Sequence, residues 1–141
     1  TPDADYIRDL FAARAAIEPA AVRWGAFADA PSLVTLTSSA FDYAARGEHQ
    51  EVSAINQRFH RTLVAALGSP TLNEQMDNLL ARMRLTFLLA IPRYPQLHAD
   101  HIQGNITLAT LIADGKRLEA ATLSHDSLMN TCEKILAVLD D

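Results

Sequence analysis

Apolar residues recur every three or four positions along almost the whole chain, which is the spacing of amphipathic α-helices. Val52, Ile55, Phe59 and Leu63 form one such series. No segment alternates apolar and polar residues for long enough to predict a strand. The pattern therefore predicts an all-α protein, an antiparallel bundle of six or seven helices.

Glycine and proline mark the expected helix ends. Pro19 either kinks the first helix or takes the first turn of a new one. Gly68, Ser69 and Pro70 read in order as a C-terminal glycine, an N-cap serine and a first-turn proline. The longest and most apolar segment follows Pro70, and we expect it to be the central helix. The expected helices cover about residues 4–17, 19–28, 31–47, 50–67, 71–91, 99–113 and 117–139.

Composition places the chain in a single domain, residues 1–141. It has 141 residues, of which 49% are hydrophobic and 21% charged. No apolar run reaches the roughly 18 residues of a membrane span, and the acidic, helix-patterned start is unlike a secretory signal. The single cysteine, Cys132, excludes an internal disulfide. We expect a cytoplasmic protein without membrane contact.

The net charge of -5 argues against this chain holding nucleic acid by itself, because phosphate binding needs clustered basic residues. The Lys and Arg residues are scattered along the sequence. Any DNA contact must therefore come from another part of a longer protein.

The candidate chemistry centres on Asn56 and His60, which lie one helical turn apart and so share a face. This spacing can present two ligands to one metal ion, and His98, His101 and His125 could join them from across the bundle. Imidazole nitrogens with an oxygen donor suit zinc, nickel, copper or iron(II). The sequence contains no HExxH, ExxH, GxSxG or phosphate-binding glycine loop, which indicates that the protein is not an enzyme.

Three stretches carry a family resemblance: "RAAIEPAAVRWGAFA" (residues 14–28), "NQRFHRTLVAALGSPTLNEQMDNLLARMR" (56–84) and "NITLATLIADGKRLEAATLSH" (105–125). In this order they resemble the C-terminal effector-binding domain, of FCD type, of FadR-type GntR transcriptional regulators. The resemblance implies a helical bundle with a central ligand or metal cavity and a homodimer surface. It also implies an N-terminal winged helix-turn-helix, which this chain lacks and through which DNA would be bound.

The resemblance further implies a divalent metal, zinc or nickel first, held by one Asp or Asn and three His. Asn56 and His60 match the first two ligands, and His125 matches the last if the preceding turn is two residues short. Counting back from the turn at Asp114 and Gly115 places the third histidine at Asn105. Counting back from His125 without a gap places it at Gln103. His101, one turn before Asn105, is the substitute.

The expected effector is a small carboxylate that shifts the dimer between two arrangements and so controls DNA binding. Arg14, Arg82, Arg84 and Thr86 are the candidate effector-binding residues. Arg14 and Glu18 also read as an ordinary solvated i,i+4 ion pair, which we favour over an inward-facing anion anchor. Arg82 and Arg84 are two apart, so at most one points inward.

Two other classes of function stay open. One is a metal-dependent enzyme with His60, His101 and His125 around an open site. The other is a structural dimerisation domain with a dry core and no ligand.

Overall fold

The computed structural model describes residues 2–140, which form an all-α bundle without a strand. The helices are α1 (Ala4–Trp24), α2 (Ala30–Ser38), α3 (Ala40–Ala45), α4 (His49–Ala65), α5 (Pro70–Ala90), α6 (Leu97–Ala113) and α7 (Arg117–Leu139), with the 3-10 turn η1 (Ile91–Arg93) between α5 and α6. The predicted fold class is confirmed. Within residues 2–140, no helix has both the length and the apolar character to cross a membrane.

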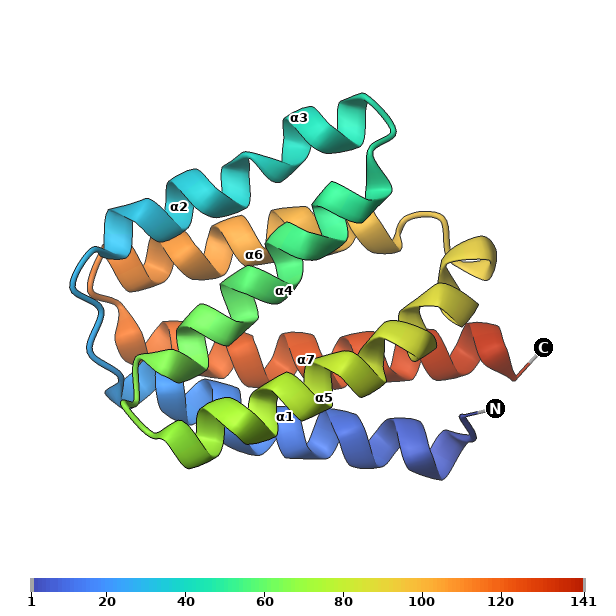
Figure 1. Cartoon of the computed structure of the whole chain (residues 1–141), viewed down its shortest axis with the longest axis horizontal. Coiled ribbons are helices and arrows are strands. Elements are labelled where there is room, and N and C mark those ends of the chain that lie inside the picture. Colours follow the sequence, from blue (N-terminus) through green and yellow to red (C-terminus); the bar gives the residue numbers. More distant parts are fainter. Residues whose placement is uncertain (1, 141) are drawn as a thin grey trace.

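The helices are arranged around two antiparallel pairs. Figure 1 shows α1 and α7 side by side, with both chain ends at the same end of the molecule, and α2 running along α6. The helices α4 and α5 cross in front of these pairs and join them. The cavities described below lie where these layers meet.

Helix α1 runs through Pro19 without ending, so the expected boundary there is wrong. Its inward residues form one continuous face, which includes Ile7, Leu10, Phe11 and Val22. This face packs along α7, and the burial outweighs the backbone hydrogen bond that proline removes.

The expected helix over residues 31–47 is instead divided at Ser39 into α2 and α3. Hydroxyl groups near the division bond back to the helix backbone: Ser39 Oγ donates to Leu36 O at 2.6 Å and Thr37 Oγ1 to Leu33 O at 2.8 Å. Such bonds compete with the regular helical pattern and bend it.

The start of α5 follows the sequence signals. Ser69 Oγ accepts from the Leu72 N–H at 3.2 Å, and Pro70 occupies the first turn. Gly68 has φ +69°, the left-handed conformation that glycine adopts most readily at a helix end.

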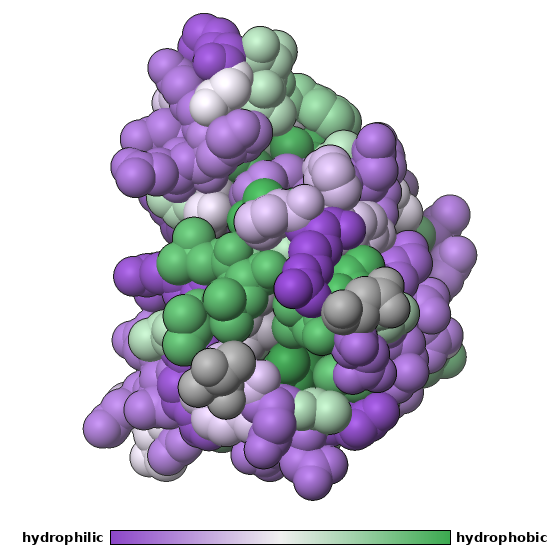
Figure 2. All heavy atoms as spheres, turned by 90° about the vertical axis from the view of Figure 1, so that its right-hand side faces the viewer, coloured by the Kyte–Doolittle hydropathy of each residue, from purple (hydrophilic) through white to green (hydrophobic). Residues whose placement is uncertain are grey.

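The core is divided into several clusters rather than one. The largest joins α1, α5 and α7 through side chains such as Leu10, Phe11 and Ile135, and another joins α2, α4 and α6 around Phe59 and Ile112. Several large apolar side chains are exposed near the C-terminal end of α5, among them Leu85 and Leu88, and Figure 2 shows apolar surface on this end of the molecule.

Candidate functional site

A buried network of three charged or titratable side chains links α1 to α4. Arg14 Nε donates to Glu18 Oε2 at 2.6 Å, and His60 Nδ1 lies 2.6 Å from Glu18 Oε1. The exposed fractions are 2% for Arg14, 0% for Glu18 and 8% for His60. The expected solvated Arg14–Glu18 pair is therefore wrong: the pair is inside the protein. The signal in the sequence was the helical face that these two residues share with Leu10 and Phe11.

Glu18 is ionised despite its burial. Burial by itself raises the pKa of a carboxyl group, but the charges of Arg14 and His60 and their hydrogen bonds outweigh it and lower the pKa of Glu18 to about 2. An ionised carboxylate can only accept hydrogen bonds, so His60 Nδ1 must carry a proton. The other ring nitrogen, Nε2, is left to interact with whatever enters the cavity beside it.

A polar cavity that is partly open at the surface adjoins this network, and a smaller, more apolar cavity lies on the other side of α6. The larger, polar cavity has a volume of about 180 Å³ and lies between α1, α6 and α7. A cavity of about 150 Å³ accommodates a benzene ring, so this one has room for a small organic molecule. Its polar lining residues are Arg14, His60, Asp100, His101, Asn105, Ser124, Ser127, Asn130, Thr131 and Lys134.

The charged side chains of this cavity differ in whether they already have a partner. Arg14 is neutralised by Glu18, although its guanidinium keeps further N–H groups beyond the two that Glu18 accepts. Asp100 accepts from the hydroxyl of Tyr94, and this bond, with burial, raises the pKa of Tyr94 to about 12. Lys134 forms no ion pair with any residue of the described chain. It is the cation best able to meet a bound anion.

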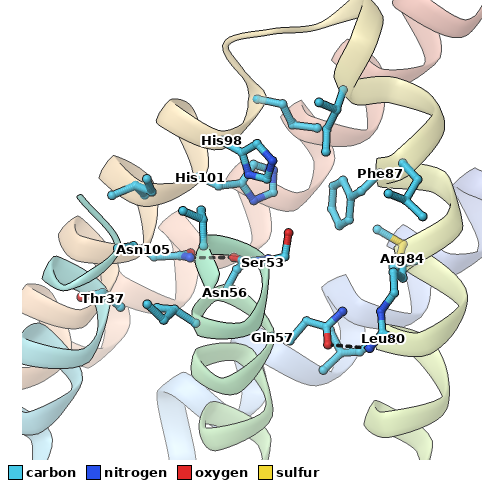
Figure 3. Close-up of a pocket in the computed structure, with 18 residues that line it drawn as sticks. Thr37, Ser53, Asn56, Gln57, Leu80, Arg84, Phe87, His98, His101 and Asn105 are labelled. Atoms are coloured by element: carbon cyan, nitrogen blue, oxygen red, sulfur yellow. Dashed lines mark hydrogen bonds between the residues drawn. The ribbon is translucent and has the colours of Figure 1, made fainter. Parts of the chain in front are cut away.

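The smaller cavity, of about 70 Å³, lies between α4, α5 and α6. Its lining is mainly apolar and includes Leu80, Met83, Phe87 and Ile102. Figure 3 shows Asn56 and Asn105 side by side on one wall of this cavity, where Asn105 Nδ2 donates to Asn56 Oδ1 at 2.7 Å. At its mouth, Arg84 donates to Gln57 at 3.0 Å.

His101 lines both cavities. It packs edge-on against Phe87, with ring centroids 5.2 Å apart, and its Nε2 has no hydrogen-bond partner within residues 2–140. Burial first, and then the nearby charges of His60, Arg14 and His98, lower the pKa of His101 to about 3. The ring is therefore neutral at physiological pH, with one nitrogen able to donate and the other to accept.

The other predicted site residues lie apart. His125 is exposed, with Nδ1 3.1 Å from Asp126 Oδ1, and it does not line the cavity. Of its neighbours on α7, Ser124 is buried against the cavity and Ser127 lines its exposed edge. Arg82 donates to the Tyr6 hydroxyl at 3.1 Å, on the side of α5 that faces α1. Thr86 is buried, and its Oγ1 has no partner among the described residues.

The structure thus brings together Arg14, His60, His101 and Asn105 around the larger cavity, and Asn56 and Arg84 around the smaller one. The sequence interpretation missed the row along α7, which comprises Ser124, Ser127, Thr131 and Lys134. The steps of three and four residues between them were the available signal, but serine, threonine and lysine at helical spacing are too common to stand out.

The donors near the cavity do not make up the expected metal site. Within residues 2–140, no three His, Cys, Asp or Glu side chains are grouped closely enough to hold a metal ion. The Asn56 amide oxygen is already bonded to Asn105, and His125 points elsewhere. His60 and His101 alone fall short of the four ligands that zinc usually takes. These residues as placed do not fit a tightly held ion, and their geometry gives no support to the expected zinc or nickel.

Comparison with models of known protein families gives a match. The family model described as "FCD domain" matches residues 9–129, which includes every element from α1 to the middle of α7. Among curated proteins and solved structures, none matches the chain.

Proposed function

Because this chain belongs to the FCD domain family, the C-terminal effector-binding domains of GntR-type transcriptional regulators, we propose that it senses a small organic acid in its larger cavity. The observation that carries the proposal is the lining of that cavity. Lys134 and the remaining N–H groups of Arg14 supply positive charge, and Ser124, Ser127 and Thr131 supply hydroxyl donors. Carboxylates are recognised by this combination of charged and neutral donors.

The buried network gives this cavity a fixed wall. Arg14 and His60 come from different helices, and Glu18 holds both at 2.6 Å, so their side chains cannot swing freely. A preorganised donor loses less conformational entropy when a ligand binds. The role that we propose for Glu18 is therefore to position Arg14 and His60, without contact to the effector.

We further propose that effector binding shifts a homodimer between two arrangements and so alters the spacing of attached winged helix-turn-helix domains on DNA. The exposed apolar side chains near the end of α5 support a self-association surface. The two cavities count against the structural alternative, a bundle with a dry core. The family counts against the enzyme alternative, because it is a regulatory one.

The test is a thermal-shift and calorimetric screen of monocarboxylates against their amides. A ligand at about 100 times its Kd stabilises the folded state by about 2.7 kcal/mol, which raises Tm by several degrees for a domain of this size. The chain contains two lysines, both exposed, and Lys116 does not line the cavity, so it is a matched control for Lys134. We expect Lys134→Gln to weaken carboxylate binding about tenfold, an effect of about 1.4 kcal/mol.

Lys116→Gln should leave carboxylate affinity within twofold of the wild type. Equal Tm shifts for acids and amides, or equal losses in the two lysine variants, would show that the cavity does not recognise carboxylates.

A further inference from the structure

The two cavities are separated by one face of α6. Leu97, His101 and Asn105 line both of them, and these residues follow each other at steps of four, one helical turn each. The side chains of these three residues therefore border both cavities.

The cavities differ in chemistry on either side of this face of α6. The larger one carries Arg14, His60, Lys134 and the hydroxyl row of α7. The smaller one is walled by apolar side chains from α4, α5 and α6, such as Leu80 and Phe87. Figure 3 shows that Phe87 and His101 face the same interior space from opposite helices. A single ligand that filled both would be polar at one end and apolar at the other.

His101 stands at the junction with an unused hydrogen-bonding group. Its ring is neutral, and Nε2 is buried and has no partner in the described part of the chain. An unpaired buried polar atom costs about 1–3 kcal/mol, which a ligand oxygen at this point would recover. A charged imidazole here would instead repel the neighbouring cations, so the neutral form is the one that accommodates an apolar chain.

We propose that the effector is an amphipathic monocarboxylic acid whose carboxylate lies in the larger cavity and whose aliphatic chain passes His101 into the smaller cavity. This rests on the proposed function and narrows its ligand class. The side chains of His101 and Leu97 turn aside to admit the chain, and His101 hydrogen-bonds the part of the ligand nearest the carboxylate. The smaller cavity, at about 70 Å³, limits how many methylenes are accommodated.

The experiment is titration calorimetry of the domain with straight-chain acids from acetate to octanoate, with 1-octanol as the neutral probe. Each methylene that enters the smaller cavity should raise affinity about fourfold, the equivalent of about 0.8 kcal/mol, until the cavity is filled. Butyrate should compete with octanoate, because the two share the carboxylate position.

Two serine variants separate the cavities. Ser53 lines only the smaller cavity and Ser127 only the larger. We expect Ser53→Phe to lower octanoate affinity toward that of butyrate, and Ser127→Phe to weaken all the acids. Circular dichroism and Tm check that each variant folds; should Ser53→Phe fail to fold, the competition and the length series of the wild type still decide.

Each other outcome is informative. Affinity that does not change with chain length overturns the tail assignment and leaves carboxylate sensing intact. Octanol that binds as tightly as octanoate overturns the assignment of the carboxylate to the larger cavity. If none of the acids binds, both this inference and the proposed function are wrong.

Discussion

Replacing Glu18 by glutamine tests whether the buried network stabilises the fold. The substitution keeps the shape of the side chain but removes the negative charge that holds Arg14 and His60. Arg14 would then be an uncompensated cation with 2% exposure. Breaking a buried ion pair by removing one partner costs about 3–5 kcal/mol.

The pKa of Glu18 gives a second estimate of the same energy. The fall from the ordinary value of 4.5 to about 2 corresponds to about 3 kcal/mol at about 1.4 kcal/mol per pKa unit. Because the folded-state pKa is lowered, this stability is present above about pH 4.5 and is lost as the pH falls toward 2. About 2 kcal/mol of it should already be gone at about pH 3.

The assay is urea unfolding followed by circular dichroism, at neutral pH and at several acidic values. We expect Glu18→Gln to lower the free energy of unfolding by about 3 kcal/mol at neutral pH, with a smaller difference from the wild type in acid. The matched control is Asp77→Asn, because Arg61 and Asp77 are also 2.6 Å apart but have side chains that are 49% and 56% exposed. Exposed pairs contribute about 0–1 kcal/mol.

A loss below about 1 kcal/mol for Glu18→Gln, equal to that of the control, would refute the reasoning. So would a difference between variant and wild type that did not shrink in acid. Either result would mean that the buried network contributes no more to the free energy of unfolding than an exposed ion pair does.

Three further predictions concern other parts of the molecule. Gly25→Ala should destabilise the fold by about 1–3 kcal/mol in urea unfolding, because a Cβ there would lie 2.7 Å from the Ala66 Cβ. Gly104→Ala should stabilise the fold by up to about 1 kcal/mol, because no atom would lie within 4 Å of the new Cβ. Equal effects of the two substitutions would contradict the packing argument. Tyr94 should ionise only near pH 12 in an ultraviolet titration, and Asp100→Asn should bring its pKa down toward 10; an unchanged curve would show that this hydrogen bond is not formed. Mass-spectrometric metal analysis of tag-free protein should find well below one zinc or nickel per chain, and stoichiometric metal would show that the donors regroup around an ion.

Most of the fold could be predicted from the sequence, because burial of apolar residues at helical spacing dominates it. The helix from residues 117–139 was predicted to the residue, and the signals at Ser69 and Pro70 gave the start of α5. Pro19 indicated a helix boundary where the helix continues, and nothing in the sequence indicated the division of the helix at Ser39. In each case packing against another helix decided the outcome, and a local signal cannot contain that information.

The candidate site was less predictable, since it depends on the rotation of each helix about its axis. Neighbouring residues on a helix point about 100° apart, so an error of one position moves a side chain from the cavity to the surface. His125 was chosen for its chemistry, yet it is exposed, and the buried residue beside it on α7 is Ser124. His60 and His101 both line the larger cavity, and His60 directly follows Phe59 on the apolar face that periodicity had identified.

The buried polar groups around the cavities are suited to sensing a ligand. The Arg14–Glu18–His60 network is satisfied by its own hydrogen bonds and therefore gives the cavity a wall that resists change. By contrast, the Nε2 atom of His101 is buried and unpaired, at a cost of about 1–3 kcal/mol that the rest of the fold must offset. A ligand that hydrogen-bonds to His101 recovers this energy only in the arrangement of the protein that can bind the ligand. Differential stabilisation of that kind is what a switch between two states requires, and couplings in such switches are typically about 1–3 kcal/mol.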